Sequence, residues 1–436
     1  MFKFFVQHRL EGYVKRYFKH HPEVKLIAVV GAAGKTTTKM AIAEVLSRKF
    51  KVQIEPRNYN EQTAVPLGIL GVEYPAPEDL RKLSVWREVF RACREQIKNS
   101  DAQIVIQELG TDHVGEIPHF AKYLSPDITV ITSIVPEHME FFGTLAAVAD
   151  EEFAMNPVSQ MVLANVDDIA EEFLAKLDPA KTGLYGLNPS ADVHFDVKVG
   201  NPLDGYSGQF VFKNSKVEAK IGLVGEHNLR AAVAAGAVGE LLGLAPTEIV
   251  AGLSEIRPVK GRMNILKGIH NSIIIDDTYN SSPSAAVAAL KTLYEIPAEQ
   301  RIAVLGNMNE LGDYAEQGHK AVGEILDGEY LEWVVTLGDL ANKYIAPLAR
   351  AAGLDVKETQ TPIEAGAFVN KVNDPERRTV ILFKGSQNGV FLEEAVKVIA
   401  EESEYPKLVR QEKDWIAKKQ YLYEQDLTAA AETDDD

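Results

Sequence analysis

Short β-branched runs alternate with helical segments from residue 25 onward. The pattern predicts strands at Leu26–Val30, Ile104–Ile106 and Ile128–Ile131, and a helix over Thr37–Lys49. Parallel strands need a long crossover connection, which is usually a helix, so this alternation is typical of a parallel sheet covered by helices. The first part of the chain is therefore predicted to be an α/β domain.

The pattern changes between residues 185 and 224, where short alternating segments contain Gly and Asn. We interpret this stretch as antiparallel strands, followed by a helix over Asn228–Leu242 that closes the first domain. The next segment, Arg257–Met263, contains Pro258 and Gly261 and is typical of a linker between domains.

A second α/β pattern follows the linker, with alanine-rich helices between short apolar runs. Its expected strands are Ser272–Ile275, Ile302–Leu305, Trp333–Leu337 and Val380–Phe383. The last residues are small and acidic, which is typical of disorder. We therefore predict an N-terminal helix (1–24), a central domain (25–256), a C-terminal α/β domain (257–412) and a partly disordered tail (413–436).

Composition narrows the class of protein. The chain has 436 residues, 46% hydrophobic and 25% charged, which is enough for two ordinary globular cores. The single cysteine, Cys93, excludes a disulfide framework and a cysteine-based zinc site, and it fits a reducing, cytoplasmic compartment. The net charge of −17 disfavours binding to nucleic acid or anionic lipid through a basic surface. Small-molecule chemistry is favoured instead.

The first 21 residues combine aromatic and basic side chains. Their apolar run, Phe4–Val6, is too short for a signal peptide or a membrane-spanning segment, so we expect no transmembrane segment. We expect an amphipathic helix here, and an anchor on a membrane surface remains the alternative.

A candidate phosphate-binding loop, Gly31–Thr38, runs from the first expected strand into a helix. Glycines such as Gly31 and Gly34 allow backbone amides to approach an anion, and the N-terminus of the helix adds its positive end. Lys35 can reach the β- and γ-phosphates of a nucleotide, and the hydroxyl of Thr36 can bind Mg²⁺. The sequence therefore predicts ATP and Mg²⁺ as cofactors.

Only two residues separate the glycines of this loop, a spacing that resembles the Mur ligase family. Further segments resemble the family's motifs and occur in the same order. They are Asn58–Glu61, Glu108–Gly110, Gly115–Ile117, Glu137–His138, Phe142–Leu145, Gly225–Asn228, Gly261–Met263, Asp276–Asn280, Leu305–Met308 and Lys384–Ser386. The resemblance covers most of the chain.

The resemblance implies a P-loop ATPase domain with a parallel sheet, followed by a Rossmann-like domain. It also implies an ATP-dependent amide ligase that forms an acyl phosphate from a carboxylate, which an amine then attacks. The motifs are most similar to those of the branch that adds D-alanyl-D-alanine to a UDP-muramoyl tripeptide. This reaction belongs to peptidoglycan synthesis, which maintains the cell wall and cell shape. Two alternatives remain, namely a related ligase for another carboxylate and amino acid, and a noncatalytic ATP-binding regulatory protein.

The resemblance also implies roles for individual residues. Catalytic roles fall to Lys35, Glu108, His138 and Arg262. Nucleotide contacts fall to Gly31, Gly34, Lys35, Thr36, Thr37, Asn228, Arg262, Asp277 and Tyr279. Magnesium ligands would be Thr36, Glu108, His138 and Glu152, and substrate contacts would be Asn60, Asn280, Asn307, Lys384 and Ser386.

The chain departs from the family's pattern at several points. Glu152 stands where the family has a carbamylated lysine, so we expect it either to supply the carboxylate directly or to be a solvated helix residue beside a weakened metal site. Gln387 replaces a family arginine, and Asn307 replaces an aspartate. Only about two dozen residues precede the first expected strand, in place of the family's domain for the uridine nucleotide. We therefore expect a different mode of donor binding, a partner that supplies donor recognition, or another donor.

Overall fold

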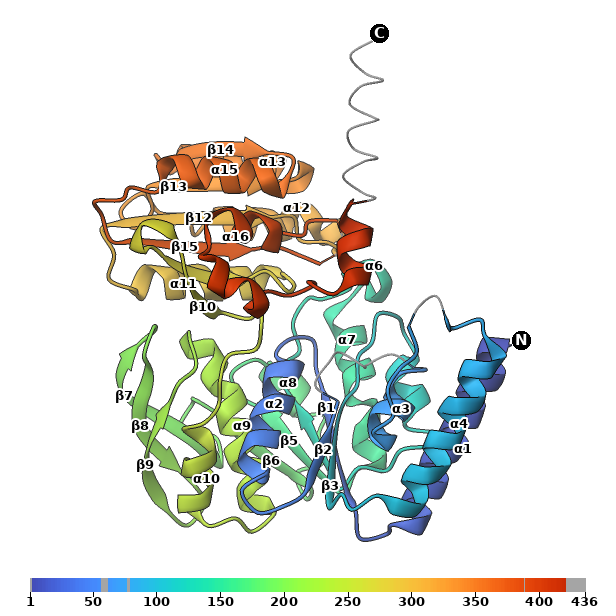
Figure 1. Cartoon of the computed structure of the whole chain (residues 1–436). Coiled ribbons are helices and arrows are strands. Elements are labelled where there is room, and N and C mark those ends of the chain that lie inside the picture. Colours follow the sequence, from blue (N-terminus) through green and yellow to red (C-terminus); the bar gives the residue numbers. More distant parts are fainter. Residues whose placement is uncertain (1, 56–61, 77–78, 388, 421–436) are drawn as a thin grey trace. The chain divides into compact units, whose positions relative to one another are not determined.

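The computed structural model describes residues 2–55, 62–76, 79–387 and 389–420. The chain divides into two units, one formed by residues up to 200 and 204–257, the other by residues 201–203 and 258 onward (Figure 1). Each unit has its own β-sheet. The α/β class predicted from the alternating pattern is confirmed.

The sheet of the first unit has the strand order β2-β3-β1-β4-β5-β6-β7-β8-β9 within the described residues. Pairing is parallel from β2 to β7 and antiparallel between β8 and β9. The strands are β1 (Lys25–Val30), β2 (Val52–Ile54), β3 (Ile104–Glu108), β4 (Ile128–Ile131), β5 (Met161–Asn165), β6 (Thr182–Gly186), β7 (Val193–Asn201), β8 (Gly205–Val211) and β9 (Lys216–Ile221).

The prediction of antiparallel strands from residue 185 onward is wrong for β6 and β7, which pair in parallel. Their contact involves only two residue pairs, Tyr185 with Val193 and Gly186 with His194. A pairing of two residues is too short to produce a recognisable hydrophobic pattern in the sequence. Whether the two strands run parallel or antiparallel is therefore decided by tertiary packing. For β8 and β9 the prediction is confirmed.

Helices cover both faces of this sheet (Figure 1). The alternation of side chains along β1 explains why, since Leu26 and Ala28 pack in one core, and Ile27 and Val29 pack in another. The helices are α1 (Phe2–His20), α2 (Lys35–Leu46), α3 (Val65–Leu70), α4 (Leu83–Asn99), α5 (Glu116–Phe120), α6 (Met139–Phe142), α7 (Leu145–Glu152), α8 (Glu171–Leu174), α9 (Leu229–Leu241) and α10 (Pro246–Leu253).

The sheet of the second unit has the order β10-β11-β15-β12-β13-β14. Among the pairings of the described strands, that of β10 with β11 is antiparallel and the others are parallel. The strands are β10 (Asn264–Lys267), β11 (Ile273–Asp277), β12 (Gln300–Gly306), β13 (Trp333–Leu337), β14 (Asp355–Thr359) and β15 (Thr379–Lys384). The helices are α11 (Pro283–Glu295), α12 (Ala315–Gly323), α13 (Asp339–Tyr344), α14 (Ala346–Ala351), α15 (Pro362–Val372) and α16 (Glu393–Ile399).

The four expected strands of this unit are all present, and the sequence missed the two edge strands, β10 and β14. Edge strands pack on one side only, and β14 is largely exposed or half-buried, so it lacks the apolar run that identifies a central strand. The packed chain also extends beyond residue 412, because residues 413–420 form a helix in which Lys419 is buried.

Candidate active site

The loop between β1 and α2 has a backbone that requires glycine at two positions. Gly31 has φ +120°, and a Cβ atom there would lie 2.3 Å from Oγ1 of Thr132 at the end of β4. Gly34 has φ +81° and is the residue before α2. Both conformations are unfavourable for residues with a Cβ. The loop therefore leads directly into the positive N-terminal end of a twelve-residue helix, where a phosphate site is expected.

Lys35 begins α2 and folds back over the loop. Its ammonium group donates hydrogen bonds to the carbonyl oxygens of Gly31, at 2.5 Å, and Ala32, at 3.0 Å. A cation is thus held at the mouth of the loop, where Gly34 is exposed and Lys35 half-buried. This geometry fits an anionic ligand, because the charge of the lysine and the end of the helix act together.

Glu108 lies beside this loop because β3 pairs directly with β1. It is the last residue of β3, and the hydroxyl of Thr36 donates to its Oε1 at 3.1 Å. Its Oε2 lies 3.2 Å from the ammonium nitrogen of Lys39, and both side chains are buried. Thr36 and Glu108 are therefore brought together as predicted, with a buried cation alongside.

Glu152 is buried against the same loop, with only 1% of its surface exposed. Its Oε2 accepts a hydrogen bond from the backbone N–H of Gly31 at 2.6 Å. The alternative of a solvated helix residue is therefore wrong. Burial raises the pKa of Glu152 to about 7, while Lys35 and the Gly31 hydrogen bond oppose this rise, and Glu137 and Glu151 add to it.

The adjacent Glu151 has a separate task. It accepts hydrogen bonds from the backbone N–H groups of Gly115, at 2.8 Å, and Ile117, at 2.7 Å. Gly115 directly precedes α5 and Ile117 lies in its first turn, where N–H groups lack partners within the helix. Glu151 therefore fixes the Gly115–Ile117 segment, and neighbouring glutamates on α7 hold two different loops.

His138 precedes α6 with φ +50°, which is unusual for a residue other than glycine. Its Nε2 lies 3.5 Å from Asp112 and 4.0 Å from Glu137, both carboxylates. Within the described part of the chain, no three His, Cys, Asp or Glu side chains form a cluster that could hold a metal ion. Thr36 and Glu108 are the oxygen donors that Mg²⁺ prefers, and phosphate and water oxygens can complete its coordination. This pair fits the ion, and the roles of His138 and Glu152 stay predictions.

Asn228 ends the short helix η3 (Glu226–Asn228) and directly precedes α9. Its side-chain amide donates to the carbonyl oxygen of Val224 at 2.7 Å, which holds the turn in place. Thr37 is buried in the first turn of α2. Asn60 lies outside the described residues.

In the second unit, the predicted residues gather at the adjacent ends of β11 and β15. Asp277, the last residue of β11, accepts a hydrogen bond from the N–H of Met263 at 3.1 Å and pairs with Lys384 at 2.8 Å. Lys384, the last residue of β15, also donates to the carbonyl oxygen of Asn280 at 2.6 Å. Both side chains are largely buried, so this pair is part of the framework of the site.

Arg262 and Tyr279 stack on each other. The guanidinium carbon of Arg262 lies 4.3 Å from the centre of the Tyr279 ring, a favourable cation–π distance. The N–H of Tyr279 donates to the carbonyl oxygen of Gly261 at 2.9 Å. The segment before β10 and the segment after β11 are thus joined, as the motif order suggested.

Two predicted substrate residues make contacts within the protein. The side-chain oxygen of Asn307 accepts a hydrogen bond from the N–H of Ala341 at 2.9 Å, in the first turn of α13. The hydroxyl of Ser386 donates to Ser281 at 3.2 Å and accepts from the N–H of Asn309 at 3.0 Å. These bonds give both side chains a role in positioning loops, and their substrate contacts stay predictions.

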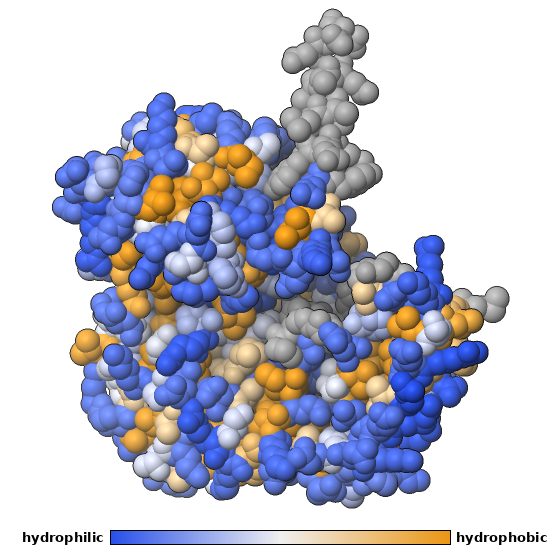
Figure 2. Space-filling view, viewed as in Figure 1, coloured by the Kyte–Doolittle hydropathy of each residue, from blue (hydrophilic) through white to orange (hydrophobic). Residues whose placement is uncertain are grey.

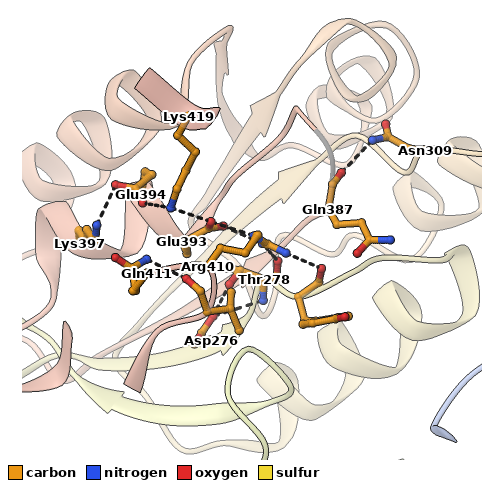
Figure 3. A network of polar contacts seen from close by, with 12 residues as sticks. Asp276, Thr278, Asn309, Gln387, Glu393, Glu394, Lys397, Arg410, Gln411 and Lys419 are labelled. Atoms are coloured by element: carbon orange, nitrogen blue, oxygen red, sulfur yellow. Dashed lines mark hydrogen bonds and ion pairs between the residues drawn. The ribbon is translucent and has the colours of Figure 1, made fainter. Parts of the chain in front are cut away.

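Residues near the C-terminus form a buried network of polar contacts that fixes the segment after β11 (Figure 3). Arg410 donates to the carbonyl oxygens of Thr278, at 2.6 Å, and Tyr279, at 3.0 Å, and to the carboxylate of Glu393, at 2.7 and 2.9 Å. Lys419 pairs with the same carboxylate at 3.2 Å. Residues 408–420, which sequence reasoning placed at a domain end and in a tail, therefore support the candidate site.

The sequence carried a signal for one of the residues that it missed. Lys39 lies one helical turn after Lys35 and faces the sheet, so helical spacing could have placed it near Glu108. No such signal exists for Arg410 and Glu393. Neither residue stands in a clear hydrophobic pattern, and their contact arises only from tertiary packing.

Comparison with known proteins identifies both units. The Mur ligase middle domain matches residues 29–239, and the Mur ligase glutamate ligase domain matches residues 261–387. The UDP-N-acetylmuramoyl-tripeptide--D-alanyl-D-alanine ligase of Bacillus subtilis is 28% identical, over 86% of this chain and 76% of the relative. The enzyme of the same name from Synechocystis sp. is 29% identical, over 88% and 75%.

Solved structures show the same fold. MurF from Acinetobacter baumannii superimposes with a TM-score of 0.73 at 24% identity, covering 89% of this chain and 79% of that one. MurF from Thermotoga maritima, solved in complex with ADP, gives 0.72 at 22% identity, covering 90% and 83%. The matches to both domains, in the same order and on the same fold, show that this chain belongs to the Mur ligase family.

Proposed function

We propose that this chain is an ATP-dependent, ADP-forming ligase that joins D-alanyl-D-alanine to a UDP-N-acetylmuramoyl tripeptide. The observation that carries the proposal is the extent of the similarity to ligases of that name, which spans both units of the chain. The candidate site supports it independently, because a phosphate loop, a strand-end glutamate and a threonine hydroxyl lie together.

The reaction requires activation of a carboxylate. A carboxylate oxygen of the tripeptide attacks the γ-phosphorus of ATP, the bond to the β-phosphate oxygen breaks, and ADP leaves. The amine of D-alanyl-D-alanine then attacks the acyl carbon, phosphate departs with the electrons of the C–O bond, and the nitrogen loses a proton. No protein nucleophile is needed, so the protein contributes mainly positioning and charge stabilisation.

The residues of the first unit suit these tasks. The N-terminal end of α2 and the charge of Lys35 would stabilise the charge on the transferred phosphate. Thr36 and Glu108 would hold Mg²⁺, which lowers the negative charge around the phosphates when it is bound. Lys39 keeps the buried carboxylate of Glu108 in one orientation through its ion pair.

The residues of the second unit that this proposal uses lie at the ends of β11 and β15 and in the segment before β10. Arg262, supported by the Tyr279 ring, presents a guanidinium group suited to phosphate oxygens. Asp277 and Lys384 fix the ends of the strands from which that segment projects. Asn228 in the first unit is the proposed contact for the adenine base.

Glu152 has a specific place in this proposal. Its buried carboxylate stands where the family carries a carbamylated lysine, and it contacts the phosphate loop directly. We propose that Glu152 supplies a permanent carboxylate near the nucleotide–magnesium complex. Activity should then be independent of added bicarbonate, and Glu152→Gln should weaken binding of ADP and Mg²⁺ measured by calorimetry. Asp150→Asn, an exposed position on the same helix, is the matched control.

The test of the function is phosphate release from ATP with Mg²⁺, a UDP-muramoyl tripeptide and D-alanyl-D-alanine, with mass analysis of the product. We expect release that requires both substrates and yields the pentapeptide. Release with another amino acid or another carboxylate would assign a different reaction of the same class. Nucleotide binding without any product would contradict the enzymatic proposal and favour a regulatory role.

A further inference from the structure

Helices α1 and α4 lie side by side on the first unit (Figure 1). The hydroxyl of Tyr17 is 2.9 Å from Oγ of Ser100, and a ring nitrogen of His21 is 2.9 Å from the carbonyl oxygen of Ile97. The C-terminal end of α1 therefore meets the C-terminal end of α4. The helices run parallel, and their N-terminal ends also lie at one end of the pair.

One side of α4 is basic from Arg87 to Lys98. Arg87, Arg91, Arg94 and Lys98 are exposed, and their spacing of four, three and four residues places them in one row. The opposite side of the helix is buried in the core and carries Trp86, Val89, Phe90 and Cys93. The row of cations is thus a regular feature of the helix surface.

A second row on α1 faces the first. Phe5, Arg9 and Arg16 follow at intervals of four and seven residues and are exposed. The two rows meet at Tyr13, because Arg9 lies 3.4 Å and Arg94 lies 3.1 Å from its hydroxyl oxygen. The guanidinium carbon of Arg16 also lies 4.7 Å from the centre of the Tyr13 ring. We call these two rows together the α1–α4 seam.

The two helices that carry the seam have a net charge opposite to that of the whole protein. Helices α1 and α4 contain nine Lys or Arg and three Glu, a net charge of +6. The remaining sequence contains 37 Lys or Arg and 60 Asp or Glu, a net charge of −23. Within the described residues, no carboxylate forms an ion pair with the six cations of the seam. The seam is therefore a concentrated positive surface on an acidic protein.

Large apolar side chains are exposed at one end of the seam. The exposed fractions are 72% for Phe4, 55% for Phe5 and 63% for Leu83, with Phe2 also exposed. Since the helices are parallel, these residues share the N-terminal end of the pair. Figure 2 shows strongly hydrophilic residues beside hydrophobic ones over these helices. None of the described helices has the length and apolar composition needed to cross a bilayer.

We propose that the α1–α4 seam binds the surface of an anionic lipid bilayer. The row of cations would attract the headgroups, while the aromatic end inserts at the boundary between headgroups and acyl chains. The exposed aromatic residues favour lipid over a nucleic acid or an acidic protein segment, which would satisfy the cations but leave the apolar end in water. The net negative charge of the whole chain argued against binding to anionic lipid. The positive charge concentrated on α1 and α4 reverses that expectation.

The proposal is tested by flotation of the full chain with lipid vesicles. We expect binding to vesicles of phosphatidylcholine with phosphatidylglycerol, little binding to phosphatidylcholine alone, and a loss of binding as salt rises. Each cation near an anionic surface contributes roughly fivefold to partitioning. Arg87→Gln with Arg91→Gln should therefore reduce binding on the order of 25-fold, whereas Lys216→Gln with Lys220→Gln, exposed positions on β9, should leave it unchanged.

The apolar end requires its own pair of variants. Phe4→Ser with Phe5→Ser should reduce vesicle binding by at least about tenfold, while Val199→Ser, 68% exposed on β7, should have no effect. Equal binding to neutral and anionic vesicles, or equal losses in the Arg and Lys variants, would overturn the proposal. So would tight binding to a DNA duplex that is unaffected by the Phe variants, since it would identify a general polyanion surface. Thermal melting of each variant checks that the fold is intact.

Discussion

The phosphate-loop region of the first unit and the strand-end region of the second both bury carboxylates, but they treat them differently. In the second unit, Glu393 contacts Arg410 and Lys419, and Asp277 contacts Lys384. In the first unit, Glu108 contacts Lys39, whereas no cation among the described residues forms an ion pair with Glu152. Instead, Glu152 is held by a backbone N–H group.

The difference teaches which contacts offset the cost of burying a charge. Glu152, which relies on a hydrogen bond, has its pKa raised to about 7 by burial. Asp276, held by the hydroxyl and N–H of Thr278, is the counterpart in the second unit, and burial raises its pKa to about 6. Hydrogen bonds, aided at Glu152 by the nearby charge of Lys35, therefore do not offset desolvation at either site. A region that keeps such a carboxylate beside a phosphate loop is suited to receive an external cation.

The largest expected effect is on the cation of the phosphate loop. Lys35→Ala should lower turnover on the order of 10³-fold, because the charge on the transferred phosphate loses the cation of the loop. The measurement is phosphate release under saturating substrates. Lys220→Ala, an exposed lysine on β9, should retain full activity. Full turnover in the Lys35 variant would mean that the nucleotide binds elsewhere.

The next effect concerns the paired carboxylate of the second unit. Arg410→Ala should lower the free energy of unfolding by about 3 kcal/mol, because Glu393 and two buried carbonyl oxygens lose their donor. Urea unfolding of the full chain measures it. The exposed Arg378→Ala should change stability by less than about 0.5 kcal/mol. A similarly small change in the Arg410 variant would show that Lys419 alone compensates Glu393.

The carboxylate without a paired cation should respond to pH. Asp276 keeps its proton in the folded state up to about pH 6, while the unfolded chain releases it near 3.8, so folding loses stability as pH rises between these values. Asp276→Asn removes this loss, which amounts to roughly 3 kcal/mol at neutral pH. Oδ2 of Asp276 has no hydrogen-bond partner among the described residues, so the NH₂ group of the new asparagine would find no acceptor there. This unsatisfied donor costs about 1 kcal/mol, and the net gain in the free energy of unfolding should be about 2 kcal/mol.

Urea unfolding of both proteins at pH 4 and pH 7 measures the difference. The variant's advantage should be largest at pH 7 and should shrink toward pH 4. An advantage that is equal at the two pH values would show that Asp276 does not titrate in this window.

The smallest effect distinguishes the two cations on Glu393. Lys419→Ala should cost about 1.5 kcal/mol in the free energy of unfolding, because Arg410 keeps the carboxylate paired. Comparison with Arg410→Ala in the same urea experiment separates the loss of an ion pair from the loss of the carbonyl contacts. Equal costs would place the whole effect in the ion pair.

The sequence by itself determined the α/β class and the positions of the central strands, because buried parallel strands are apolar runs of defined length. It also determined the phosphate loop, since the positive φ angles of Gly31 and Gly34 are a local requirement for glycine, whereas the close approach of Thr132 to Gly31 is set by tertiary packing. Glu108 and Asp277 were predicted at strand ends, and each is the last residue of its strand, β3 and β11 respectively. These positions follow directly from the apolar runs that precede them.

Only the tertiary structure decided which charges meet. Lys39 pairs with Glu108 across 69 positions of the chain, and Arg410 reaches Thr278 across 132. It likewise decided that Glu152 is buried, and that the basic rows of α1 and α4 form one seam. Hydrophobic periodicity reports which face of an element is buried, whereas an ion pair depends on the packing of elements far apart in sequence.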